Sequence, residues 1–127
     1  MRRKDKTILC VDDNQVQVSG WSLYLQQHGY SVLSSCKAEE GLQMFATQPV
    51  DAVILDYSMP ELDGNSVSTL MKRMKPQVPI ILFTGVSEMP ADALAHVDGF
   101  MLKGKPPSDM LEIIDRLLKI GKQVESA

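Results

Sequence analysis

Short runs of apolar residues, each closed by a polar residue, recur along the chain. One of them, Ala52 to Leu55, is unbroken and ends in Asp56. A run of this length suits a strand that is buried on both faces, as in a parallel sheet. Similar runs predict five strands, over residues 6–12, 30–35, 51–56, 78–83 and 100–102.

Amphipathic segments alternate with these strands. Apolar residues spaced three or four positions apart predict helices over 14–28, 38–47 and 64–75, a short irregular helix within 87–97, and a last helix that follows Pro106-Pro107 and reaches about residue 122. The alternation predicts a doubly wound α/β fold. We expect a flavodoxin-like, five-stranded parallel sheet of order 2-1-3-4-5 with helices on both faces.

Several residues predict how the helices begin, end and pack. Asn14 and Ser108 are suitable N-caps for the first and last helices, and Gly29 suits the end of the first. The residues expected to point inward from the third helix are Val67, Leu70, Met71 and Met74. Gly20 costs about 1 kcal/mol relative to Ala inside a helix, which suggests a close contact there.

Length and composition indicate one domain over 1–127, with a core of about residues 6–122 and no output domain. The net charge of −3 and the lack of a basic stripe argue against nucleic-acid binding. Cys10 lies in an apolar run and Cys36 follows the second strand, so a reduced, cytoplasmic setting is expected. No apolar run approaches the roughly 18 residues of a membrane span.

The predicted sheet gathers polar groups at one edge. The carboxyl ends of parallel strands meet there, and these carry Asp12, Asp13, Asp56, Thr84 and Lys103. Three converging carboxylates would repel one another, and a hard cation such as Mg²⁺ removes that conflict. A metal, a lysine and a hydroxyl suit a phosphoryl group, with Asp56 as acceptor and Asp12 and Asp13 as metal holders. His28 and His96 are expected at the surface rather than as ligands.

Four motifs give the chain a resemblance to the receiver domain of two-component response regulators. They are Val11-Asp12-Asp13-Asn14, Leu55-Asp56-Tyr57-Ser58-Met59-Pro60 with Asp63-Gly64, Phe83-Thr84-Gly85, and Phe100-Met101-Leu102-Lys103. The resemblance implies that Asp56 accepts a phosphoryl group from a phosphohistidine of a sensor kinase. It also implies that Asp13, Asp56 and the backbone carbonyl of Ser58 bind Mg²⁺ directly, while Asp12 acts through a metal-bound water.

The same resemblance implies a switch. Thr84 would hydrogen-bond the phosphoryl group and move toward it, and Phe100 would turn inward as it moves. The surface of the fourth helix, fifth strand and fifth helix would then change. Ser58 and Val86 occupy the positions that tune the lifetime of the phosphate, and Gly85 keeps access open.

The site lysine has two candidates. Members of the resembled family usually have proline after this lysine, whereas Lys103 is followed by Gly104, Lys105 and Pro106. Lys105-Pro106 therefore competes as the Lys-Pro pair. We favour Lys103, because it keeps the register of the fifth strand and the placing of the last helix.

Alternative functions remain open at this point. A degenerate receiver would act by protein contact without phosphorylation. A Mg²⁺-dependent phosphatase would need a substrate cap, for which the connections are too short, and a second acid, which Tyr57-Ser58 does not supply. The favoured interpretation is a signalling phosphoacceptor rather than an enzyme. Its partners would be a sensor histidine kinase or phosphotransfer protein and a downstream protein, with no nucleic acid or membrane, as a monomer or weak homodimer.

Overall fold

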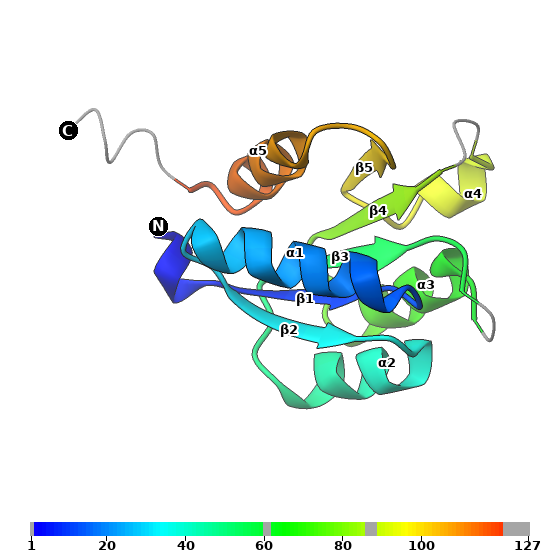
Figure 1. The fold of residues 1–127 in the computed structure, drawn as a ribbon. Helices are drawn as coiled ribbons and strands as arrows, with labels where there is room; N and C mark the ends of the chain where they lie inside the picture. The colour runs from blue at the N-terminus through cyan, green and yellow to red at the C-terminus, as the bar shows by residue number, and fades with distance from the viewer. Residues whose placement is uncertain (1, 60–61, 86–88, 121–127) are drawn as a thin grey trace.

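A five-stranded parallel sheet lies at the centre of the protein (Figure 1). The computed structural model describes residues 2–59, 62–85 and 89–120. The strands are β1 (Thr7–Val11), β2 (Ser31–Ser35), β3 (Ala52–Asp56), β4 (Ile80–Thr84) and β5 (Gly99–Leu102). Their order is β2-β1-β3-β4-β5, which confirms the predicted topology.

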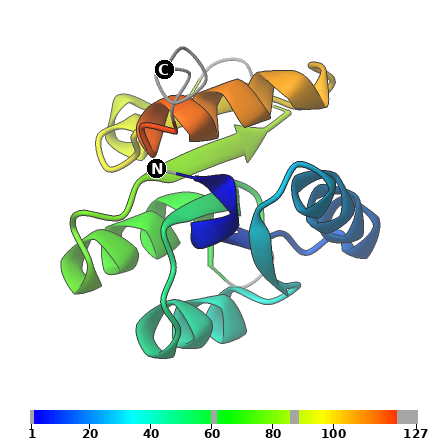
Figure 2. The ribbon, with the colours of Figure 1, turned by 90° about the vertical axis from the view of Figure 1, so that its left-hand side faces the viewer.

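Helices cover both faces of the sheet. After a 3₁₀ turn, η1 (Arg3–Asp5), come α1 (Gln15–Gln27), α2 (Ala38–Thr47), α3 (Gly64–Met74), α4 (Ala91–Leu94) and α5 (Pro107–Leu117). Figure 2 shows α1 and α5 on one side of the sheet and α2 and α3 on the other. None of the helices in the described ranges is long and apolar enough to cross a membrane.

The sheet divides the interior into two cores. The α1/α5 core includes Cys10, Trp21, Ile54, Ile81, Phe83, Met101 and Ile114. The α2/α3 core includes Val11, Phe45, Leu55, Val67, Met71 and Leu82. Successive strand residues point to opposite faces, so each central strand contributes to both cores. Every residue of β3 and β4 is buried, as their unbroken apolar runs predict.

The ends of α1 follow the sequence prediction, whereas the start of α5 does not. The side chain of Asn14 accepts hydrogen bonds from the backbone N–H groups of Val16 and Gln17. Gly29 has φ of 100°, the left-handed conformation that commonly ends a helix. Ser108 is not the N-cap of α5, because the helix already begins at Pro107, whose fixed φ suits the first helical position.

Three packing predictions were wrong. Val67 and Met71 are buried as predicted, whereas Leu70 and Met74 are 38% and 42% exposed, because the buried stripe of α3 continues through Gly64 and Ser68. A Cβ atom at the exposed Gly20 would meet nothing within 4 Å, so this glycine marks no close contact.

The last helix is shorter than predicted. It ends at Leu117 rather than near residue 122, and Lys119 then adopts left-handed backbone with φ of 56°. Residues 121–127 lie outside the described ranges.

An ion pair ties the N-terminal turn to α5. The Arg3 guanidinium donates to both carboxylate oxygens of Asp115, at 3.1 and 2.6 Å. The Tyr30 hydroxyl donates to the same carboxylate at 2.5 Å. This cluster therefore joins η1, α5 and the start of β2, at the edge of the sheet where the strands begin.

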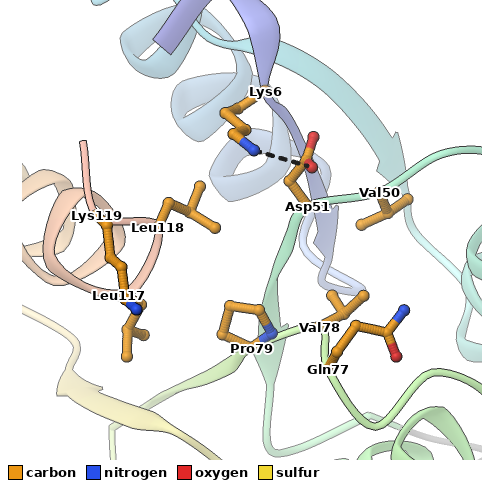
Figure 3. A pocket seen from close by; sticks show the side chains of 9 residues that line it. All are labelled: Lys6, Val50, Asp51, Gln77, Val78, Pro79, Leu117, Leu118 and Lys119. Carbon is orange, nitrogen blue, oxygen red and sulfur yellow. Dashed lines mark ion pairs between the residues drawn. The ribbon is translucent and has the colours of Figure 1, made fainter. Parts of the chain in front are cut away.

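A cavity of about 290 Å³ opens at that same amino-terminal edge (Figure 3). Its walls include Pro79 before β4, Leu117 and Lys119 at the end of α5, and the ion pair between Lys6 and Asp51. It lies across the sheet from the carboxyl ends of the strands and takes no part in the acidic site described next.

Candidate functional site

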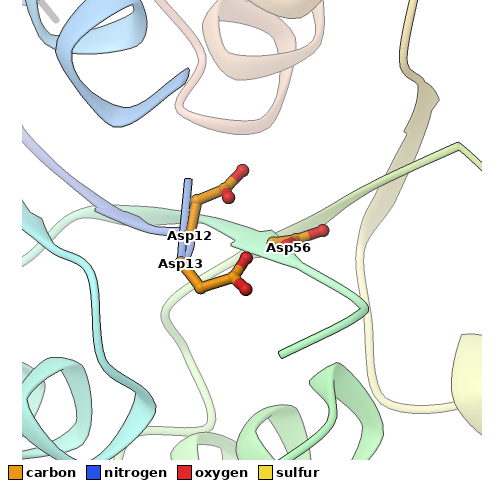
Figure 4. Close-up of side chains that lie close together, drawn as sticks. All are labelled: Asp12, Asp13 and Asp56. Atoms are coloured by element: carbon orange, nitrogen blue, oxygen red, sulfur yellow. The ribbon is translucent and has the colours of Figure 1, made fainter. Parts of the chain in front are cut away.

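Three carboxylates meet at the carboxyl edge of the sheet (Figure 4). Asp12 and Asp13 follow β1, and Asp56 is the last residue of β3. One oxygen from each lies within 4.8 Å of the others. Asp12 and Asp56 are only 4% and 2% exposed, whereas Asp13 is open to solvent. The site is thus a buried acidic pair with an exposed third acid.

The register of the sheet sets this convergence. Val11 of β1 pairs with Leu55 of β3, so Asp12 and Asp56 end neighbouring strands. The Asp12 carboxylate accepts a hydrogen bond from the backbone N–H of Asn14 through Oδ1, at 2.9 Å. Its Oδ2 is buried and accepts no hydrogen bond from any described residue. A buried carboxylate oxygen without a partner is costly, and a cation would satisfy it.

Burial raises the affinity of this site for protons. Desolvation raises the pKa of Asp12 to about 6, and the Asp56 charge adds to the rise while the Asn14 hydrogen bond opposes it. Desolvation likewise raises the pKa of Asp56, against the opposing effect of Lys103. Both acids therefore hold their protons more tightly than in water, chiefly because burial disfavours the charged carboxylate.

Lys103, and not Lys105, contacts Asp56. The Lys103 Nζ lies 3.2 Å from Asp56 Oδ1. The Lys103 backbone N–H donates to the Thr84 carbonyl at 2.7 Å, which continues the β4–β5 ladder and fixes where the side chain begins. Lys105 is exposed. A Cβ on Gly85 would come 3.9 Å from Lys103 Cδ, so the stem of the lysine passes beside this glycine.

The loop after β3 shapes the rim of the site. The backbone N–H of Ser58 approaches Asp56 Oδ1 at 3.4 Å. Asp63 caps α3 by accepting from the Ser66 N–H at 2.8 Å. A Cβ on Gly64 would lie 2.7 Å from the Tyr57 Cα, so no larger residue fits there without a backbone shift. The Asp-Gly pair therefore starts α3 directly against the acceptor strand.

The residues of the implied switch are placed as follows. Thr84 ends β4 and is 1% exposed. Phe100 in β5 pairs with Leu82 and packs, partly buried, against the α2/α3 core. Pro60 and Val86, which the sequence motifs include, lie outside the described residues.

Phe83, which the sequence motifs include only as the residue before Thr84, is a further neighbour of the site. Its ring centroid lies 5.6 Å from the Lys103 Nζ. In the sequence it is one more apolar residue in a strand, and only the pairing of Phe83 with Asp56 across β3 and β4 brings it to the site. The signal in the sequence is that the predicted strands ending in Asp56 and Phe83 are neighbours in a parallel sheet, where their ends lie side by side.

The donor set suits a hard divalent cation. All three side chains offer oxygen, and one buried oxygen lacks a partner among the described residues. Mg²⁺ prefers carboxylate and carbonyl oxygens and keeps several waters, which the open side at Asp13 would admit. The described cluster holds no histidine or cysteine, the ligands that zinc prefers.

Comparison with known proteins matches this chain to one family. The model described as "Response regulator receiver domain" matches residues 8–115. GlrR, a transcriptional regulatory protein of Escherichia coli, is 30% identical over 122 residues, which cover 94% of this chain and 28% of GlrR. The response regulator MprA of Mycobacterium leprae is 32% identical over 94% of this chain and 54% of its own length.

Another relative is a sensor kinase. LuxN of Vibrio campbellii, an autoinducer 1 sensor kinase/phosphatase, is 32% identical over 68% of this chain and 10% of its own length. The chain therefore spans between about a tenth and about half of these curated relatives.

Solved structures share the fold over nearly the whole chain. A CheY-like receiver domain from Methanospirillum hungatei has a TM-score of 0.84 at 25% identity, covering 96% of this chain and 98% of that one. The response regulator TrrA of Thermotoga maritima, solved in complex with Mg(2+)-BeF, has a TM-score of 0.83 at 30% identity. The match covers 88% of this chain and 98% of TrrA.

Proposed function

Because the chain belongs to the response regulator receiver domain family of two-component systems, we propose that it accepts a phosphoryl group on Asp56 in a Mg²⁺-dependent reaction. The observation that carries this proposal is the contact between Asp56 and Lys103 beside two further acids. The protein would act as a signalling phosphoacceptor rather than as an enzyme that turns over a separate substrate.

The reaction is a transfer between nitrogen and oxygen. An oxygen of the Asp56 carboxylate attacks phosphorus, the P–N bond of a phosphohistidine breaks, and the imidazole leaves with the bond's electron pair and gains a proton. Lys103 passes from the Asp56 carboxylate to an oxygen of the phosphoryl group and balances its charge. Bound Mg²⁺ supplies further neutralisation of the phosphoryl oxygens.

The metal would be held by residues already in place. Asp13, Asp56 and the backbone carbonyl of Ser58 would bind it directly, and Asp12 through water. The unpartnered Asp12 Oδ2 supports this assignment, as does the Mg(2+)-BeF complex of the related TrrA.

The switch that follows would use two residues of neighbouring strands. Thr84 would hydrogen-bond the phosphoryl group, and Phe100 would turn inward, so that the surface of α4, β5 and α5 changes. Phosphorylation would act by shifting a population between two conformations. Unchanged amide chemical shifts over these three elements with a phosphoryl mimic bound would contradict this part of the proposal.

The partners follow from the chemistry of the donor. A sensor histidine kinase or a phosphotransfer protein would supply the phosphohistidine, as the sensor kinase LuxN among the relatives suggests. A downstream protein would read the switched surface.

Intact mass after incubation with acetyl phosphate and Mg²⁺ tests the acceptor. We expect one added phosphoryl group, absent in Asp56→Asn and without the metal. Asp63→Asn is the matched control, because asparagine also caps a helix and Asp63 contacts α3 rather than the acceptor. No added mass on folded wild-type protein would favour a degenerate receiver that binds partners without phosphate.

The two lysines are compared in the same assay. A hydrogen bond to a charged group contributes about 1.5–3 kcal/mol, so Lys103→Met should slow phosphorylation by about tenfold to a hundredfold. Lys105→Met should leave the rate unchanged, since Lys105 is exposed beyond β5. The opposite pattern would assign the site to Lys105.

A further inference from the structure

The Lys103 ammonium has a second neighbour besides the acceptor. Its Nζ lies 3.2 Å from Asp56 Oδ1 and 5.6 Å from the centroid of the Phe83 ring. A lysine cation within about 6 Å of an aromatic face is attracted by the negative face of the ring. The side chain of Lys103 is only 31% exposed, so water weakens this attraction less than at an open surface.

The sheet fixes Phe83 at this place. Phe83 pairs with Asp56 on one side and with Met101 on the other. Phe83 and Met101 belong to the α1/α5 core, and Lys103 follows Met101 by two residues, so its side chain leaves the chain toward that same face. The ring therefore lies between the acceptor strand and the origin of the lysine.

The Phe83 ring packs against a second aromatic ring. Trp21 of α1 meets Phe83 edge-on, with centroids 5.3 Å apart and planes at 83°. Trp21 and Phe83 are 8% and 5% exposed, so both are packed tightly. A ring held in this way presents a constant face to the cation.

We propose that Phe83 is a positioning residue for phosphoryl transfer, and that its ring face holds the Lys103 ammonium within reach of Asp56. The inference rests on the proposed function. Lys103 must exchange a carboxylate for a phosphoryl oxygen during the reaction, and the ring is a neighbour that stays in place throughout that exchange. Phe83 does not touch the phosphoryl group and acts only through the lysine.

A double-mutant cycle tests the route of action. The phosphorylation rate with acetyl phosphate and Mg²⁺ is measured for wild type, Phe83→Leu, Lys103→Met and the double variant. Loss of the aromatic face should slow phosphorylation by about threefold to tenfold when Lys103 is present, and leave the residual rate of Lys103→Met unchanged. Equal slowing in both backgrounds would overturn the proposal, because a purely structural role does not depend on the lysine.

Two further variants of this chain distinguish a positioning role of Phe83 from a packing role. Ile81→Val lies on the same strand and face and is fully buried, so it should lower stability without slowing phosphorylation. Pentafluorophenylalanine at position 83 keeps a packed ring but removes its negative face. It should slow the reaction as Phe83→Leu does, and a wild-type rate with this ring would overturn the proposal.

Proton NMR gives a readout that needs neither metal nor phosphate. Over an aromatic face, the ε-methylene protons of Lys103 should resonate upfield of those of the exposed Lys105, and Phe83→Leu should abolish the difference. Identical Lys103 proton chemical shifts in wild type and Phe83→Leu would refute the contact. If wild type takes up no phosphoryl group, the proposed function fails, whereas this comparison still decides whether Phe83 holds the lysine.

Discussion

Removing the charge of Asp12 should stabilise the metal-free protein. A carboxyl pKa raised from 3.8 to about 6 corresponds to about 3 kcal/mol of lost stability at pH values well above 6. In Asp12→Asn the side-chain oxygen can still accept from the Asn14 N–H, and the amide can donate to the neighbouring carboxylates. We expect a gain of about 1–3 kcal/mol, with about 3 as the ceiling set by the pKa.

The sign of the pH dependence follows from linkage. The folded protein binds the Asp12 proton more tightly than the unfolded chain does, so the penalty appears as pH rises from about 4 to about 6. Above that window it is fully present. Well below pH 3.8 the group is protonated in both states, and wild type and Asp12→Asn should be equally stable.

Urea unfolding in the presence of a metal chelator measures this difference. Thermal unfolding gives a second measurement: for a chain of 127 residues, a gain of about 2 kcal/mol raises the unfolding midpoint by about 7 °C. The other acids titrate in both proteins, so their effects largely cancel. With Mg²⁺ added, wild type should gain stability through binding and the variant should gain little.

The control is Asp5→Asn, which neutralises an exposed carboxylate in η1 at the opposite edge of the sheet. Its stability should stay within about 0.5 kcal/mol of wild type. The reasoning fails if Asp12→Asn is no more stable than wild type at pH 8 without metal. It also fails if the gain persists undiminished at pH 4.

Two further predictions concern the scaffold and are read from urea unfolding. Gly20→Ala should stabilise the fold by about 0.5–1 kcal/mol, because the added methyl group meets nothing within 4 Å. Gly41→Ala should destabilise it by about 1–3 kcal/mol, because the added Cβ would lie 2.8 Å from Val11 Cγ2. A change of the same sign in both variants would contradict this. Asp115→Ala should lower the free energy of unfolding by about 2–4 kcal/mol, since it leaves the buried Tyr30 hydroxyl without its acceptor. A loss of stability no larger than that of Tyr30→Phe would refute this account.

The parallel sheet and its acidic edge could be predicted because the sequence itself shows both the alternation of strands and helices and the polar residue that ends each strand. Unbroken apolar runs ending in Asp12, Asp56 and Thr84 specify buried parallel strands, and parallel strands bring their ends together. Lys103 could not be separated from Lys105 by motif alone. In the structure the Lys103 N–H donates to the Thr84 carbonyl, and the Lys103 Nζ lies 3.2 Å from Asp56 Oδ1.

Helix faces and ends were predicted less well, for local reasons. Leu70 and Met74 share helical spacing with Val67 and Met71, which is why they were predicted to point inward. The buried stripe of α3 also includes Gly64 and Ser68, so it is turned away from Leu70 and Met74. Two prolines in succession hide which of them begins α5, and the second does. Phe83 was assigned no role beyond its place in a motif, because an aromatic residue in a core strand looks the same whether or not a cation lies over its ring.

The contact between Trp21 and Phe83 gives the molecule an optical reporter. Trp21 is the only tryptophan in the chain, and its indole lies one ring away from the lysine that contacts Asp56. Indole emission responds to nearby charge and to ring packing. Fluorescence from the natural sequence, without an attached dye, thus originates beside the acceptor, so the same emission can be followed while metal is titrated and while a phosphodonor reacts.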